Sequence, residues 1–107
     1  MVNPMAGEVA LVMDGDAYAL KLTLGALAEL EEALGAESLV DLVERFETGR
    51  FRTRDVMALL LAGLHGGGHP VRAEALLSAE IQGGPLEAAR VAGLLLARAF
   101  AMPVAAG

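Results

Sequence analysis

The chain has 107 residues, the length of one domain, and it contains no cysteine. The lack of cysteine excludes a disulfide framework, a thiolate metal site and a catalytic thiol. Fourteen acidic against eight basic residues give a net charge of −6, which opposes unaided binding to nucleic acid or to anionic lipid. Leu and Ala supply 40 residues and aromatic side chains only four, a balance that favours helices over strands.

No targeting or membrane segment is expected. The longest apolar run covers residues 56–64, whereas a bilayer span needs about 20 apolar residues. The first eight residues show no basic segment followed by an apolar one, so we expect no secretory signal there.

A β-hairpin is predicted over residues 8–22. Asp14-Gly15 is a favoured type I′ turn pair, because both of its positions need a positive φ. Alternating apolar residues on both sides of this turn indicate one inner face, made of Val9, Leu11, Met13, Tyr18, Leu20 and Leu22. Since an isolated hairpin is marginal in water, it must pack on the helices or on another subunit's strands.

Two amphipathic helices are predicted next. The first covers 24–34, with Thr23 as N-cap and Gly35 after its end. Its inner stripe is Leu27, Leu30 and Leu34, with Leu24 beside them. The second starts after the N-cap Ser38 and is stopped by Gly49, and its inner stripe is Leu39, Leu42, Val43 and Phe46.

Three more helices complete the chain. The third, capped by Thr53, is apolar on every side over 56–64, so it is either the centre of the bundle or a helix with an unpartnered face. The segment 65–70 breaks it. The fourth covers about 71–81 and faces inward with Ala73, Leu76, Leu77 and Ile81. The fifth covers about 86–101 and faces inward with Ala88, Val91, Ala92, Leu95, Leu96 and Ala99.

The sequence therefore predicts an α+β, mostly α fold in a single compact domain over residues 1–107. An N-terminal β-hairpin (8–22) is followed by about five short helices (24–101) and a short flexible tail (103–107).

No motif indicates catalysis, a cofactor or a metal. His65 and His69 are four residues apart, as in helical zinc sites, but three glycines between them disfavour a helix and no further ligand lies nearby. Two solvent-exposed loop histidines are the favoured interpretation. We read Gly66, Gly67 and Gly68 as a flexible hinge, because a P-loop would need a preceding strand and a Lys.

Four arginines fall within ten residues: Arg45, Arg50, Arg52 and Arg54. They could form a docking patch for an acidic partner, but a solvated loop with neutralising acids nearby is the favoured interpretation.

Apolar surplus is the feature that most indicates function. The third helix is apolar all round, the hairpin is apolar on both faces, and Leu94 lies outside the main stripe of the fifth helix. A small domain has limited interior, so self-association or capture of an apolar helix is one interpretation. A tightly packed Leu/Ala core that needs no partner is the other. The residues that we predict to bind a partner are Leu59, Leu61, Leu94 and Phe100.

The runs over 7–15, 22–31 (LTLGALAELE from residue 22) and 60–68 (LLAGLHGGG) carry a family resemblance. The chain resembles small proteins of gene transfer agents and siphophage-type tail clusters, described as tail tube or tail assembly chaperone proteins. The resemblance implies a non-enzymatic protein of phage-like tail morphogenesis that binds the tape-measure protein or tail tube subunits and forms homo-oligomers. It also implies a place in the bacterial cytoplasm or, transiently, on the assembling tail.

The resemblance leaves two roles open within tails. A chaperone would keep the hydrophobic tape-measure protein soluble, whereas a minor tail, tail tube or connector subunit would stay in the particle. The few predicted strands favour the chaperone, because a tail tube subunit of such systems is usually larger and β-rich. An acidic helical adaptor unrelated to tails is a third alternative, and an enzyme is a distant fourth.

Overall fold

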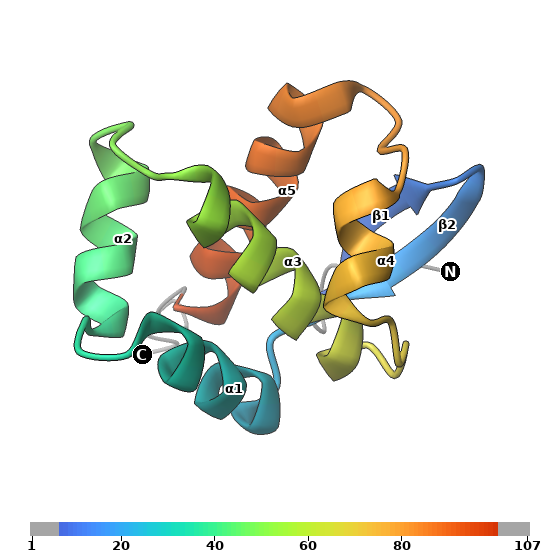
Figure 1. The fold of residues 1–107 in the computed structure, drawn as a ribbon. Coiled ribbons are helices and arrows are strands. Elements are labelled where there is room, and N and C mark those ends of the chain that lie inside the picture. Colours follow the sequence, from blue (N-terminus) through green and yellow to red (C-terminus); the bar gives the residue numbers. More distant parts are fainter. Residues whose placement is uncertain (1–6, 101–107) are drawn as a thin grey trace, which may run out of the picture.

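A β-hairpin and five helices form one globule in the computed structural model, which describes residues 7–100 (Figure 1). The strands are β1 (Val9–Met13) and β2 (Asp16–Leu20). The helices are α1 (Leu24–Leu34), α2 (Leu39–Glu47), α3 (Thr53–Gly66), α4 (Ala73–Ser78) and α5 (Gly84–Ala99). The α+β, mostly α fold class is thus confirmed, while the predicted tail at 103–107 lies outside the described residues.

The hairpin forms as its sequence pattern predicts. β1 and β2 are antiparallel, with Val9 opposite Leu20 and Met13 opposite Asp16. Asp14 and Gly15 have φ angles of 52° and 84°, the positive values that the tight turn requires. Val9, Leu11, Met13 and Leu20 are buried, so the predicted inner face packs on the helices.

A third chain segment extends this small sheet on the free side of β1. Ile81 forms an antiparallel bridge with Met13. The Gln82 amide donates to the Val12 carbonyl at 3.0 Å, and the Asp14 amide donates to the Glu80 carbonyl at 2.9 Å. Ile81, which was predicted to end a helix, therefore forms an isolated β-bridge instead.

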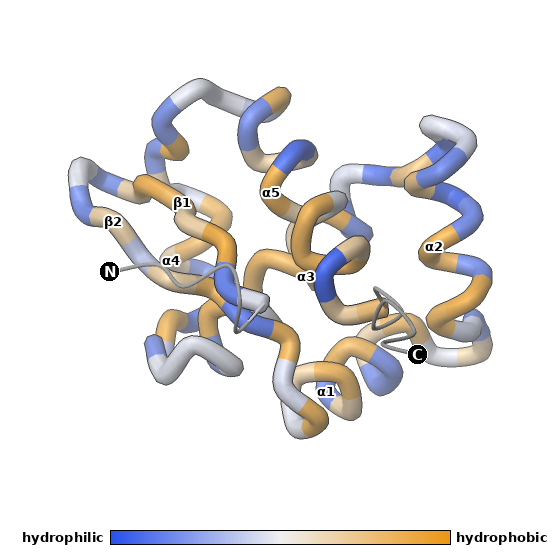
Figure 2. Tube along the Cα trace, turned by 180° about the vertical axis from the view of Figure 1, so that it is seen from behind, coloured by the Kyte–Doolittle hydropathy of each residue, from blue (hydrophilic) through white to orange (hydrophobic). Residues whose placement is uncertain are grey.

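Helix α3 is the centre of the fold. It packs against α1, α4, α5 and β2, and Leu59, Leu60, Ala62 and Leu64 are at most 1% exposed. Its apolar circumference is therefore used inside the molecule. The outer helix α2 instead alternates between hydrophilic and hydrophobic positions (Figure 2), and only its Leu42 is fully buried.

The predicted end of α3 and start of the fourth helix are wrong. α3 begins at Thr53, after the cap position Arg52, and it continues through His65 and Gly66. A glycine ends a helix only where its backbone leaves the helical region, and the first positive φ of this run is at Gly68. Helix α4 has six residues instead of the eleven expected for 71–81.

Four predicted inner side chains are exposed, among them Ala73 in the first turn of α4. Leu24 is 87% exposed because it stands at the first position of α1, beyond the edge of α3, and the buried small residue there is Ala26. Leu77 is 72% exposed because the short α4 is anchored by Leu76 alone. Ala99, in the last turn of α5, is exposed as well.

Candidate functional site: an apolar groove beside helix α5

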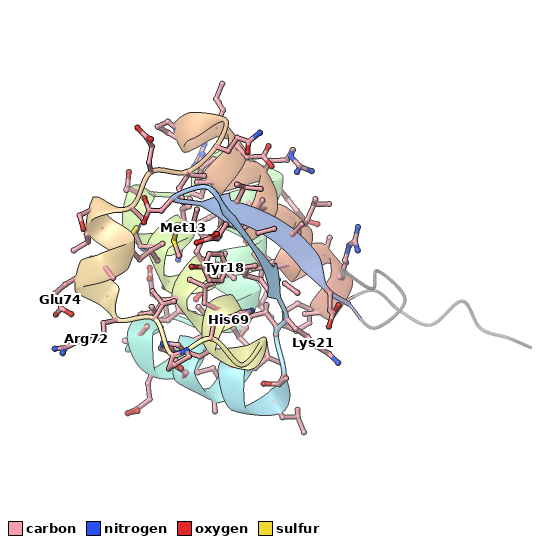
Figure 3. The ribbon with its side chains drawn as sticks, turned by 90° about the vertical axis from the view of Figure 1, so that its right-hand side faces the viewer. Met13, Tyr18, Lys21, His69, Arg72 and Glu74 are labelled. Atoms are coloured by element: carbon pink, nitrogen blue, oxygen red, sulfur yellow. The ribbon has the colours of Figure 1, made fainter. Side chains whose placement is uncertain are left out.

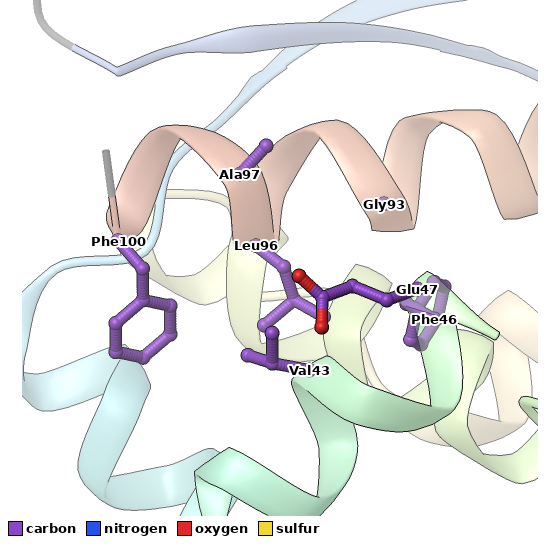
Figure 4. A pocket seen from close by; sticks show the side chains of 7 residues that line it. All are labelled: Val43, Phe46, Glu47, Gly93, Leu96, Ala97 and Phe100. Carbon is purple, nitrogen blue, oxygen red and sulfur yellow. The ribbon is translucent and has the colours of Figure 1, made fainter. Parts of the chain in front are cut away.

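An open groove of about 370 Å³ runs between α2 and the C-terminal half of α5 (Figure 4). We call it the α2–α5 groove. It is lined by Val43, Phe46, Glu47, Gly93, Leu96, Ala97 and Phe100. Gly93 and Ala97 lie one turn apart on the same face of α5, and these two small residues leave space above the helix at both positions. Phe100, 43% exposed, stands at one end, and Glu47 supplies the charged side chain of the lining.

The dimensions of this groove suit a helical segment. α5 rises about 1.5 Å per residue, so the stretch from Gly93 to Phe100 is about 10 Å long, or two helical turns. Phe46 is held in place by Phe51, whose ring stacks on it with centroids 4.6 Å apart. One wall of the groove is therefore fixed before anything binds.

The four residues predicted to bind a partner differ in their exposure to solvent. Leu59 is 0% exposed in the core, so its selection was wrong, since α3 is enclosed and the residue offers no surface to a partner. Leu61 and Leu94 are half-buried against the core. Phe100 lies on the α2–α5 groove, and partner binding by Leu61, Leu94 and Phe100 stays a prediction.

Sequence reasoning missed most of the exposed apolar side chains. Leu24, Val40, Leu77 and Leu86 are between 66% and 87% exposed. They stand at helix ends or on the outer faces of short helices, where periodicity alone does not separate a buried from an exposed position.

The three glycines of the predicted hinge lie at the end of α3. A Cβ atom on Gly66 would lie 2.0 Å from the Lys21 carbonyl oxygen, and one on Gly67 would lie 2.0 Å from the Ala19 carbonyl oxygen. Both glycines therefore permit close approach of α3 to β2 and to the residue after it. Their role as a hinge stays a prediction.

The prediction for the two histidines is partly right: His65 is exposed but belongs to α3, and His69 lies in the loop after α3 but is half-buried. The Nδ1 atom of His65 lies 2.9 Å from both carboxylate oxygens of Glu29 on α1, and its Nε2 atom lies 2.6 Å from the Val71 carbonyl. Hydrogen bonding to Glu29 and then to Val71 raises the pKa of His65, because both ring nitrogens can donate only in the charged form. His69 packs edge-on against Tyr18, with ring centroids 5.0 Å apart (Figure 3).

The arginine cluster divides into two pairs. Arg45 donates from Nε and Nη2 to the two oxygens of Asp55, both at 3.0 Å, and from Nη1 to Glu37 at 3.1 Å. Arg52 donates its backbone amide to Asp55 at 2.8 Å and its Nη2 to Glu37 at 3.0 Å. Arg50 and Arg54 are exposed and make no side-chain ion pair with any residue of 7–100.

Asp55 is the buried charge that this network serves, with an exposed fraction of 2%. Burial by itself raises the pKa of the carboxyl group, but the hydrogen bonds from Arg45 and from the Arg52 amide outweigh it, and the pKa is lowered overall. The network fixes α2 against the start of α3, and so it fixes one wall of the α2–α5 groove.

Within residues 7–100, no three His, Asp or Glu side chains come together as a metal site. In the same part of the chain, no helix has the length and apolar character needed to cross a bilayer.

Comparison with known proteins gives the family. The model of the family described as "Phage tail tube protein, GTA-gp10" matches residues 6–102. The chain therefore belongs to this family of phage and gene transfer agent tail proteins. Membership makes it a tail-related structural protein, and the family is not one of known enzymes. Searches of curated proteins and of solved structures found no match.

Proposed function

We propose that the protein is a tail assembly chaperone, which binds an apolar helical segment of the tape-measure protein in the α2–α5 groove. The observation that carries the proposal is the open groove itself, with Leu96 in its lining and Phe100 at its end. A helix with apolar residues at three- and four-residue spacing buries its face in such a groove, as helix-in-groove complexes do.

Two further features support a chaperone role. The net charge of −6 favours the solubility of a complex with a hydrophobic helix. A groove two turns long gives only modest affinity, but many copies bound along one long helix would together cover it.

Co-expression tests the proposal. A candidate tape-measure segment is produced with and without this protein, and we expect it to stay soluble only when the protein is present. Ala97→Arg places a charge in the groove and should abolish the rescue. Ala99→Arg is the matched control, since Ala99 is exposed on the same helix outside the groove lining. A soluble fraction that Ala97→Arg leaves unchanged would count against the groove, and no rescue by the unaltered protein would count against the chaperone.

The second candidate is a structural tail subunit that stays in the finished particle. The family description as a tail tube protein favours it. Mass spectrometry of purified particles separates the two roles, because stoichiometric copies in the particle would overturn a transient chaperone. The alternative of an adaptor unrelated to tails is disfavoured by the family match.

A further inference from the structure

A second apolar groove, also of about 370 Å³, shares no lining residue with the α2–α5 groove, although its Phe51 stacks on Phe46 of that groove. We call it the α3–α5 groove, because the starts of α3 and α5 form most of it, with α4 and the 81 position closing one side. Its lining is apolar except for Thr53 and consists of Phe51, Thr53, Val56, Met57, Leu60, Leu76, Ile81, Pro85, Leu86, Ala88 and Ala89. Leu86 is 86% exposed beside this apolar lining.

Three arginines flank two of the lining residues along the chain, although none of them lines the groove itself. Phe51 and Thr53 of the lining alternate along the chain with Arg50, Arg52 and Arg54. Arg52 is engaged by Glu37, but Arg50 and Arg54 have no ionic partner among residues 7–100. Two free guanidinium groups beside an apolar groove select a partner that brings an apolar anchor together with carboxylates.

The outward face of α1 has this chemistry. Leu24 is 87% exposed, and Ala28 and Glu31 follow it at the spacings i+4 and i+7, on the same face of the helix. Glu32 is exposed next to Glu31, and neither carboxylate forms an ion pair with a residue of 7–100. Glu29, by contrast, is engaged by His65.

We infer that the α3–α5 groove binds α1 of a second copy of this chain. Leu24 enters the apolar groove beside Leu86, and Glu31 and Glu32 pair with Arg50 and Arg54. The charges match in sign and number, and burying the Leu24 side chain adds a hydrophobic contribution to such an interface.

The position of the two surfaces determines the kind of assembly. α1 lies at the bottom of the molecule in Figure 1, whereas α3 and α5 start in its upper part. A contact between two different surfaces at opposite ends is heterologous, so a pair of copies joined by it keeps one free groove and one free α1. Repetition of such a contact gives rings if the rotation closes and filaments if it does not. This inference goes beyond the chaperone proposal, because it uses another groove and another occupant.

Charge reversal tests the inference. We expect the unaltered protein to self-associate in a concentration-dependent way in sedimentation velocity runs at low salt, and less at high salt, where exposed charges are screened. Glu31→Arg with Glu32→Arg, or Arg50→Glu with Arg54→Glu, should weaken the association by about tenfold or more, since each tenfold step needs only about 1.4 kcal/mol. The control is Glu44→Arg with Arg72→Glu, two exposed charges outside both surfaces, which should change nothing.

Mixing the two charge-reversed proteins provides the sharper readout. Each is monomeric alone, because its own α1 and groove carry the same sign of charge. In the mixture, the basic α1 of one fits the acidic groove of the other, and the reverse contact also fits, so assembly should return. A loss of fold cannot produce this rescue, and circular dichroism confirms that each variant is folded.

Engineered cysteines locate the contact, and the native chain has none to interfere. A Leu24→Cys copy mixed with a Leu86→Cys copy should give a mixed disulfide on mild oxidation. Val40→Cys, whose side chain is 66% exposed on α2, replaces Leu24→Cys in the control and should not crosslink. A protein that stays monomeric at all concentrations, or a dimer that neither charge reversal affects, would overturn the inference. Neither result bears on the tape-measure rescue, so the two proposals fail separately.

Discussion

The two ends of helix α3 are both held by a charged contact, but in opposite surroundings. At the N-terminal end, Asp55 is 2% exposed and receives three hydrogen bonds from Arg45 and Arg52. At the C-terminal end, the His65 and Glu29 side chains are 33% and 39% exposed. The buried contact excludes water from both partners, whereas solvent screens the exposed one. The two contacts should therefore differ in free energy and in the pH at which each is lost.

Removal of the buried carboxylate should have the largest effect. Asp55→Ala leaves the Arg45 guanidinium and the Arg52 amide without their partner, and losing one member of a buried pair costs about 3–5 kcal/mol. Urea unfolding followed by circular dichroism measures this loss. Because the pKa of Asp55 is lowered, its contribution is present above the pKa of the unfolded state and is lost as the pH falls through the lower folded value. An Asp55→Ala protein as stable as the unaltered one would show that the Asp55 network does not stabilise the fold.

The contact of α3 with Lys21 should be next in magnitude. Gly66→Ala improves the helix propensity, but the new Cβ would lie 2.0 Å from a backbone oxygen, so α3 or the segment after β2 must move. Overpacking of this kind costs about 1–3 kcal/mol. Gly25→Ala is the matched control within α1, where the nearest atom is 3.9 Å away, and it should stabilise by up to about 1 kcal/mol. Thermal unfolding of the pair compares them, and equal stabilisation by both substitutions would contradict the close approach.

The exposed end of α3 should give a small effect with the opposite pH dependence. The pKa of His65 is raised in the folded state, so its contribution is full below the unfolded value of 6.5 and is lost as the pH rises through the folded value. His65→Ala should cost about 1 kcal/mol or less at mildly acidic pH and nothing at alkaline pH. Unfolding curves for both proteins across this range measure the difference. A cost of His65→Ala that grows as the pH rises would contradict a raised pKa of His65 in the folded protein.

The smallest effect is expected where a pair is solvent-exposed and bridges no two elements. Arg90 donates to Glu87 three residues earlier on α5, at 2.6 and 2.8 Å. Arg90→Ala should leave the unfolding midpoint unchanged, because short distances alone do not stabilise an exposed pair. A midpoint lowered as much as by His65→Ala would show that connecting two elements adds nothing.

Local signals were sufficient for the elements that are defined by their own residues. Thr23 and Gly35 mark the ends of α1, and Asp14-Gly15 marks the hairpin turn, because capping and positive φ depend on one or two side chains. The pairing of Arg45 with Asp55 could not be read in this way, since it depends on how α2 is oriented against α3. The interpretation of Arg45 and Arg52 as solvated loop residues was incomplete for the same reason.

The fourth helix shows a second limit. An inner stripe of Leu76, Leu77 and Ile81 presupposes that all three belong to one helix. Ile81 instead reaches the core from an extended segment paired with Met13, so α4 ends at Ser78 and Leu77 is left outside. The exposed groove residues were missed because periodicity identifies the apolar stripe of one helix. It does not show where the stripes of two neighbouring helices leave a groove between them.

The bridge between Met13 and Ile81 also sets the order of events during synthesis. The Glu80 amide donates to the Asp14 side chain across 66 positions of sequence, at 2.9 Å. A hairpin emerging from the ribosome is marginal by itself, and α3, α5 and residues 80–82, which pack against it, are all added later. The small sheet can thus acquire its full set of neighbours only after residues 80–82 have been added to the chain.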